Sequence, residues 1–177
     1  MKYILISTLI ISLLSLLFSP VNLLAYIGMF LCFTLSALGT ARGILSISKY
    51  VSGASILAPH VGTKSILGTV VCEANFLTGI ITCVMINNTL NLNIDKELSD
   101  KAHYIYFSSG LFVGICNYYS SEATGLICAV ISMMDAKDPS LFYKIVILEI
   151  IPASIGLIGF IMGIVLNSKA PFFDLEN

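Results

Sequence analysis

Charged residues are scarce in this sequence. Only 11% of its 177 residues are charged, against 57% that are hydrophobic, and the mean hydropathy is +0.96. Soluble domains contain roughly 45–50% apolar residues, so this composition excludes an ordinary soluble protein and indicates an integral membrane protein. Nine basic and ten acidic residues give a net charge of −1, so the chain has no basic surface for nucleic acid.

Clusters of residues that bind metals or form disulfides are also missing. No CxxC motif or Cys/His pair occurs, and the cysteines lie in apolar runs, so we expect them to be small buried side chains without metal or disulfide. They are Cys32, Cys72, Cys83, Cys116 and Cys128. His60 and His103 lie in or near expected loops without a second ligand and are predicted to be solvated. The phosphate-binding pattern GxxxxGK[ST] is absent too, so we expect no cofactor, no catalytic residue and no ATPase site in this chain.

Polar breaks divide the chain into apolar segments near the ~20 residues that a membrane-spanning helix needs. They lie at roughly 3–18, 22–49, 64–91, 102–132 and 139–168. The breaks are short, so the sequence predicts an all-α membrane protein of about five transmembrane helices without a soluble module. A cleaved signal peptide is the alternative for the first segment. Because Pro20 fits badly after a cleavage site, a retained helix is expected.

Basic residues near the segment ends predict the orientation in the membrane. Five of them flank the breaks at 50–63 and 134–139. They are Arg42, Lys49, Lys64, Lys137 and Lys144. These two loops are therefore expected on the cytosolic side, and the loop at 92–101 and the tail at 169–177 on the lumenal side. With five spans, the N-terminus is cytosolic and the C-terminus lumenal.

The chain contains an internal duplication. An offset of 76 residues aligns Glu73 with Glu149, and the preceding helices align at an offset of 82. The second offset pairs Gly28 with Gly110 and Gly43 with Gly125. The sequence therefore predicts two repeated helical hairpins, each with a glutamate at matching depth in its second helix.

The repeat also predicts the organisation of the chain. An N-terminal transmembrane helix (1–21) precedes the first hairpin (22–91), the lumenal loop (92–101), the second hairpin (102–168) and the lumenal tail (169–177). Small residues recur near every fourth position in the first helix of each hairpin, a spacing that lets helix backbones approach closely in lipid. We expect these helices to form a tightly packed inner wall, with the glutamate-bearing helices outside. The alternative is an ordinary helix pair.

Glu73 and Glu149 each lie near the middle of an apolar segment. A charged side chain at the bilayer centre costs about 2.5–3.5 kcal/mol on insertion scales. A glutamate there must therefore be neutral, be paired with an opposite charge, or serve the function of the protein. Because desolvation disfavours the ionised form, such a residue carries a proton in lipid and releases it at a hydrated or cationic site. A structural hydrogen bond is the alternative role. Two glutamates at repeat-related positions favour proton binding.

The stretches TKSILGTVVCEANFLTGI and DAKDPSLFYKIVILEI, with the small-residue helix and SGAS…AP, resemble the proteolipid subunits of vacuolar-type rotary ATPases. The c-double-prime type is the most similar, because it combines an extra N-terminal helix with a glutamate in both hairpins. The resemblance covers nearly all of 22–170. It implies a ring of c-type proteolipids in a vacuolar or other acidic endomembrane. The ring turns against a stator a-type subunit, and central-stalk subunits meet its cytosolic loops.

The resemblance also implies roles for the two glutamates. The proton carrier of c-double-prime proteins falls on Glu73, the primary proton-binding residue, whereas Glu149 occupies the position that ordinary c-type proteolipids use and is secondary. Small proton-coupled multi-span transport is the alternative function, but it needs a polar substrate pocket, for which the sequence offers too few polar groups. Protons are favoured over sodium because the neighbours of Glu73 are poor oxygen donors.

Three further residues depart from the family pattern. Pro152 has no N–H, so the carbonyl of Leu148 loses its helical donor, and we hypothesise that this carbonyl accepts a bond from a protonated neighbour, with Glu149 as one candidate. A tolerated kink is the alternative. Arg42 and Glu122 are candidates for a structural ion pair, because an isolated buried charge is costly. Alternatively, each faces water or lipid headgroups.

Overall fold

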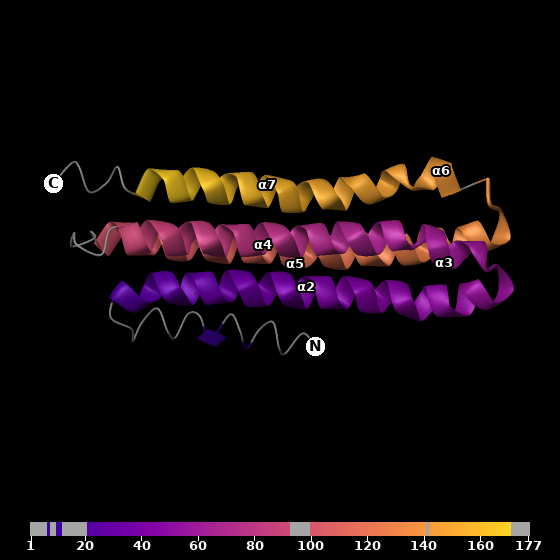
Figure 1. Ribbon diagram of the computed structural model, residues 1–177, viewed down its shortest axis with the longest axis horizontal. Helices are drawn as coiled ribbons and strands as arrows, with labels where there is room; N and C mark the ends of the chain where they lie inside the picture. The colour runs from indigo at the N-terminus through magenta and orange to yellow at the C-terminus, as the bar shows by residue number, and fades with distance from the viewer. Residues whose placement is uncertain (1–6, 8–9, 12–20, 93–99, 141, 171–177) are drawn as a thin grey trace.

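The computed structural model describes residues 7, 10–11, 21–92, 100–140 and 142–170. Within them the chain forms a bundle of long helices that alternate in direction (Figure 1). The long helices are α2 (Val21–Leu57), α4 (Ile66–Leu92), α5 (Asp100–Lys137) and α7 (Ile147–Lys169). Two short helices, α3 (His60–Lys64) and α6 (Phe142–Ile145), precede α4 and α7. The two hairpins therefore run in the same direction, as the duplication predicts.

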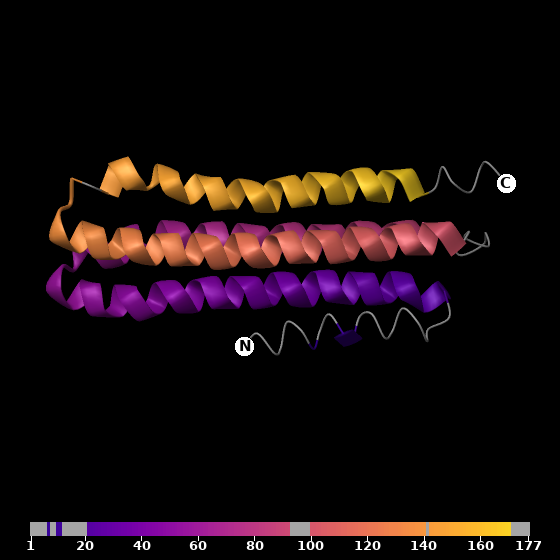
Figure 2. The same cartoon turned by 180° about the vertical axis from the view of Figure 1, so that it is seen from behind.

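The helices pack as a diamond rather than as two separate pairs. Within the described residues α4 and α5 each contact every other long helix, whereas α2 and α7 do not touch. Figure 2 shows α5 lying between α2 and α7 when the bundle is seen from behind. The contact between α2 and α5 is the most extensive. The first helices of the two hairpins are thus the closest pair in the bundle.

Glycines bring the backbones of α2 and α5 into direct contact. A Cβ atom on Gly110 would lie 2.7 Å from the carbonyl carbon of Gly28, and one on Gly125 would lie 2.5 Å from the carbonyl oxygen of Gly43. The glycines that meet are the ones that the repeat alignment pairs. These glycines in the first helix of each hairpin therefore serve the contact with the other hairpin.

Replacing Gly125 by alanine is expected to lower the stability of the bundle by about 1–3 kcal/mol, because the added methyl group overlaps backbone atoms that cannot move aside. The same change at Gly53 of α2 is a matched control, since a Cβ there meets no atom of the described residues within 4 Å. Alanine at Gly53 is expected to be neutral or stabilising. Thermal unfolding of the detergent-solubilised protein measures both. Equal melting temperatures for the two variants would contradict the close contact.

The helices extend further than the apolar segments predict. α2 continues through most of the predicted break at 50–63, ending at Leu57, and α3 occupies part of the remainder. α5 likewise runs to Lys137, into the break at 134–139. Hydropathy marks where lipid contact ends, but a helix continues into water until a residue such as Pro59 or Pro139 removes a backbone donor.

Among the described residues, three stretches are long and apolar enough to cross a membrane: Leu23–Leu57, His60–Asn91 and Ile147–Lys169. α5 is as long as α2 but carries more polar residues. The predicted span at 3–18 lies outside the described residues apart from Ser7, Ile10 and Ile11. The structure is thus an all-helical membrane protein whose described part forms a single bundle.

Candidate functional site

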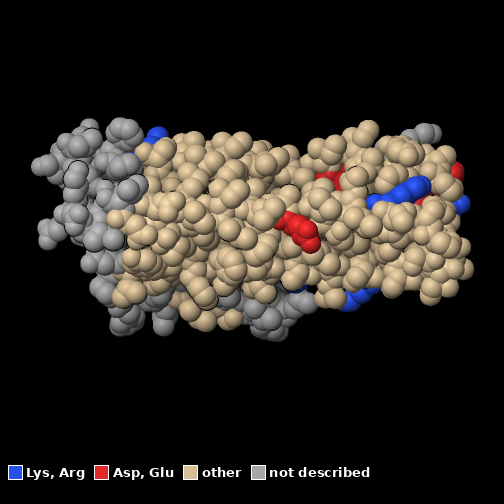
Figure 3. Space-filling view, in the orientation of Figure 1, with Lys and Arg blue, Asp and Glu red and all other residues tan. Residues whose placement is uncertain are grey.

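Glu73 lies on the outer surface of α4. Its side chain is exposed, and so are Val70 and Leu77, the neighbours one turn away on the same face, each 56% exposed. Figure 3 shows an acidic side chain near the middle of this face and a second, smaller acidic patch beside it, while most of the other charged side chains gather near the α3 end. The carboxyl group of Glu73 therefore has apolar neighbours on its helix and is accessible from outside the bundle.

Glu149 occupies the opposite environment. Its side chain points into the bundle and is only 4% exposed, and its Oε1 atom has no hydrogen-bond partner among the described residues. Gly68 of α4 makes the space for it, because a Cβ there would lie 2.8 Å from Glu149 Oε1 and 2.6 Å from Cys128 Cβ. The two repeat-related glutamates are therefore not equivalent: Glu73 is accessible from outside and Glu149 is enclosed.

This difference arises because α4 and α7 present different faces to the bundle. The buried face of α4 consists of Gly68, Cys72, Asn75, Gly79, Thr82, Ile86 and Leu90. The buried face of α7 consists of Glu149, Pro152, Gly156, Gly159, Gly163 and Asn167. With the glutamates aligned, the two faces are related by roughly a quarter turn about the helix axis. Sequence periodicity did not reveal this, because apolar side chains lie on both sides of each helix.

A network of hydrogen bonds crosses the centre of the bundle. Asn75 Nδ2 donates to Ser120 Oγ at 2.8 Å and to Ser121 Oγ at 3.2 Å. Ser120 Oγ in turn donates to the carbonyl oxygen of Pro152 at 2.8 Å. Asn117 Nδ2 donates to Ser36 Oγ at 3.2 Å. In lipid each polar group must find its partner within the protein, so these bonds link all four long helices.

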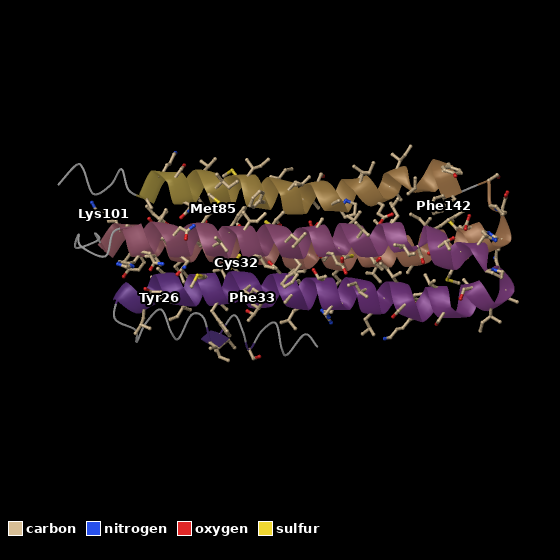
Figure 4. The ribbon with its side chains drawn as sticks, in the orientation of Figure 1. Tyr26, Cys32, Phe33, Met85, Lys101 and Phe142 are labelled. Carbon is tan, nitrogen blue, oxygen red and sulfur yellow. The ribbon has the colours of Figure 1, made fainter. Side chains whose placement is uncertain are left out.

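Thiols add weaker contacts between the helices. Cys32 of α2 points toward α4 (Figure 4) and donates to the carbonyl oxygen of Gly79 at 3.7 Å. Cys72 Sγ donates to the carbonyl oxygen of Ser121 at 3.5 Å. All five cysteines are free, and three of them, Cys32, Cys72 and Cys128, are buried. They pack as small side chains, as their apolar surroundings predict.

The contact proposed for Pro152 is not present among the described hydrogen bonds. Within the described residues Glu149 Oε1 has no partner, so it does not bond the freed carbonyl of Leu148. α7 is helical from Ile147 to Lys169, so the helix continues past Pro152. The proline is instead held through its own carbonyl oxygen, which accepts the bond from Ser120.

Arg42 and Glu122 lie together on the α2 and α5 side of the bundle. Arg42 Nη1 is 3.2 Å from Glu122 Oε1, and the two side chains are 25% and 32% exposed. The guanidinium also bonds the hydroxyl of Tyr118 and lies 5.6 Å from the centre of its ring. Both charges are thus neutralised within one subunit, partly shielded from the surroundings.

A second ionic cluster, which the sequence did not predict, lies at the α3 end. Asp135 is fully buried, and its Oδ1 atom accepts a bond from Lys64 Nζ at 2.7 Å. His60 Nε2 lies 3.6 Å from the other carboxylate oxygen, Oδ2. Lys64 Nζ is also 4.8 Å from the ring centre of Phe142, which Figure 4 places at this end of the bundle. The side chain of His60 is 42% exposed, in agreement with the predicted solvation, and lies beside this buried carboxylate.

The prediction of a solvated His103 is wrong, since this residue is 7% exposed. It follows the start of α5 closely, where neighbouring helices already surround the chain. Its position beside charged residues such as Lys101 suggested a loop, but α5 begins at Asp100.

Comparison with known proteins identifies the family. The family model that describes the C subunit of ATP synthase matches residues 107–166, from α5 into α7. The c'' subunit of the V-type proton ATPase of Saccharomyces cerevisiae is 31% identical over 85% of this chain and 72% of its own length. The c''2 subunit of the V-type proton ATPase of Arabidopsis thaliana is 31% identical over 81% of this chain and 83% of its length.

Ordinary c-type proteolipids are also similar, at lower identity. The 16 kDa c proteolipid of the Homo sapiens V-type proton ATPase is 27% identical over 82% of this chain and 91% of its length. Both levels of similarity agree with the resemblance found in the sequence. The chain belongs to the proteolipid subunits of V-type proton ATPases, and within them to the c'' type.

Proposed function

We propose that this chain is a proton-carrying member of the rotor ring of a V-type ATPase, with Glu73 as the primary proton-binding residue and Glu149 as a secondary one. The exposure of Glu73 between the exposed apolar side chains of Val70 and Leu77 carries this proposal. A carrier must meet lipid in one position of the ring and the stator in another. Glu73 faces outward, where it can do both, whereas Glu149 is enclosed by α4 and α5.

The chemistry of the cycle follows from the surroundings of the carboxyl group. In lipid the ionised form is disfavoured, so Glu73 travels protonated and neutral. At a hydrated or cationic site on a stator, the carboxylate becomes the favoured form and the proton leaves. Reprotonation from a second aqueous access then returns the residue to its neutral form. One proton thus crosses the membrane for each passage of the subunit.

The proposed organisation has five membrane spans. An N-terminal helix (1–21) precedes two hairpins (22–91 and 102–168), which are joined by a lumenal loop (92–101) and followed by a lumenal tail (169–177). The basic side chains near the α3 end in Figure 3 support a cytosolic position for that end. The protein assembles with other c-type proteolipids in a vacuolar or similar acidic endomembrane. It contacts an a-type stator and, through its cytosolic loops, the central stalk.

Proton-coupled transport of a small solute is the alternative function. A transporter of this kind binds its substrate near the middle of the membrane, between helices, and needs polar groups there. The hollow between α5 and α7 is lined by apolar side chains: Leu126, Ile127, Val130, Ile131 and Leu148. The polar groups of the bundle centre bond one another instead. These observations favour the rotor subunit.

Carbodiimide labelling in native membranes tests the assignment of the carrier. Mass-spectrometric mapping is expected to find the label on Glu73. Labelling of this residue should fade at high pH, as the carboxyl group ionises, and its extent should follow the loss of proton pumping. Labelling confined to Glu149 would contradict Glu73 as carrier and indicate that the chain works like an ordinary c-type proteolipid. Absence of label from both residues would contradict proton binding altogether.

A further inference from the structure

We propose that Asn75 is a positioning residue for the proton carrier: its hydrogen bonds to α5 fix the rotation of α4 about its axis and hold Glu73 on the outer surface of the bundle. This inference rests on the proposed function of Glu73. Asn75 lies two residues after Glu73 on α4. Its proposed role is to orient the helix, which is distinct from binding the proton and from filling space in the bundle.

The geometry of α4 links the two side chains rigidly. Residues two apart on an α-helix point about 200° away from each other. Asn75 is 4% exposed and faces the bundle, so Glu73 must face away from it. Any rotation of α4 that carries Glu73 toward a neighbouring helix also carries the carboxamide of Asn75 away from Ser120 and Ser121.

Apolar packing alone does not select this rotation. The exposed face of α4 carries Val70, Leu77 and Ile81, and lipid tails accept such side chains as readily as a protein interior does. Gly68 and Gly79 on the buried face permit close approach to other helices but make no directional bond through a side chain. A carboxamide in lipid, by contrast, requires hydrogen-bond partners, and these are available to Asn75 in its observed orientation.

The partners of Asn75 are themselves fixed. Ser120 accepts from Asn75 and donates to the carbonyl oxygen of Pro152, so one bonded chain runs from α4 through α5 to α7. Asn75 Oδ1 faces Gly156 of α7, where a Cβ would lie only 2.5 Å away. Asn75 therefore contacts both α5 and α7. These contacts fix the rotation of α4 relative to both helices of the second hairpin.

The second hairpin of the same chain shows the contrast. At the offset that aligns the glutamates, Ile151 occupies the position of Asn75 and is 62% exposed. Its helix presents a different face to the bundle, and Glu149 points inward with 4% exposure. The helix with an asparagine two residues after its glutamate directs that glutamate outward, and the helix without one directs it inward.

The test compares carbodiimide labelling in assembled rings in native membranes. The readouts are the labelling rate at Glu73, its ratio to the rate at Glu149 in the same chain, and the pH of half-maximal labelling, all normalised to ring abundance. Asn75→Leu is expected to slow labelling of Glu73 roughly three- to tenfold, consistent with the loss of interhelical hydrogen bonds in a membrane. It should also shift the pH of half-maximal labelling. Ser120→Ala is expected to act in the same direction but less strongly.

Ser36→Ala is the matched control. Ser36 is also buried and accepts a bond from Asn117. It lies on α2 and packs against Gly79 of α4, but its bond does not involve Asn75. Its loss is expected to leave labelling of Glu73 within about twofold of the unchanged chain, because it removes one bond of comparable strength elsewhere. A purely structural role for Asn75 would instead raise labelling of Glu149 by loosening the bundle and leave Glu73 unchanged.

Wild-type labelling rate and pH dependence at Glu73 in Asn75→Leu would overturn the inference. If Asn75→Leu does not accumulate in membranes, Ser120→Ala decides, and unchanged labelling in that variant overturns it equally. Failure of the proposed function is a separate result: in that case Glu73→Gln would leave proton pumping intact, whatever the behaviour of Asn75→Leu.

Discussion

Replacing Glu73 by glutamine is expected to reduce proton pumping to the background level of membranes without a functional ring. Glutamine has nearly the same shape but neither binds nor releases a proton, so the subunit with this change does not complete its passage through the stator. Because the subunits of a ring turn together, a single inactive subunit stops every other one. ATP-driven acidification of vesicles, at matched amounts of assembled ring, measures this effect.

Glu149→Gln provides the matched control for this prediction. It makes the same chemical change at the repeat-related position, where the side chain is 4% exposed and Oε1 lacks a hydrogen-bond partner in the described part of the chain. Glutamine keeps the shape of the side chain and cannot ionise in this enclosed site, so assembly should be preserved. We expect most of the pumping activity to remain. Loss of pumping in Glu149→Gln together with normal pumping in Glu73→Gln would reverse the assignment.

Much of the fold follows from the sequence. The duplication predicts two hairpins in the same direction, and the small residues at four-residue spacing predict the close contact of their first helices. The structure brings Gly28 to Gly110 and Gly43 to Gly125. These features are predictable because the close approach of two helix backbones in lipid requires small side chains at fixed spacing, and small residues at that spacing can be recognised in the sequence.

The rotation of the outer helices was not predictable in the same way. In a soluble protein the polar face of a helix identifies its outside, but in lipid both faces of α4 and α7 are apolar. The repeat alignment therefore predicts equal depth for Glu73 and Glu149 but not their rotation in the bundle, where one is exposed and the other buried. Polar contacts such as those of Asn75 decide the rotation, and their partners lie 45 or more residues away in the chain.

The ionic cluster at the α3 end was missed for a related reason. Lys64 and Asp135 are 71 residues apart. Asp135 lies in the predicted break at 134–139, whereas Lys64 only flanks the other predicted cytosolic break, at 50–63. Charged residues at membrane surfaces are usually solvated, so the sequence predicts no contact between these two. Only the packing of α3 and α5 shows that Asp135 is fully buried and depends on Lys64 for its partner.

Replacing Lys64 by methionine is therefore expected to destabilise the bundle by about 3–5 kcal/mol, the usual cost of leaving one charge of a buried pair without its partner. Methionine keeps most of the aliphatic length that packs near Phe142 but removes the ammonium group 2.7 Å from Asp135. His60, at 3.6 Å from the other carboxylate oxygen, compensates only in part because 42% of its side chain is exposed to solvent. Denaturant unfolding in mixed micelles measures the loss.

A second change at the same site separates charge burial from packing. Asp135→Asn keeps the shape of the side chain and removes the buried charge, and Lys64, whose side chain is 26% exposed, can then turn toward water. The double variant Lys64→Met with Asp135→Asn is accordingly expected to recover most of the stability lost by Lys64→Met alone, since neither residue then leaves an unpaired charge inside the protein. Lys49→Met, at an exposed lysine of α2, should change stability by no more than about 0.5 kcal/mol. Additive losses in the double variant would show that the cluster is held by packing around Lys64, and that its ion pair contributes little.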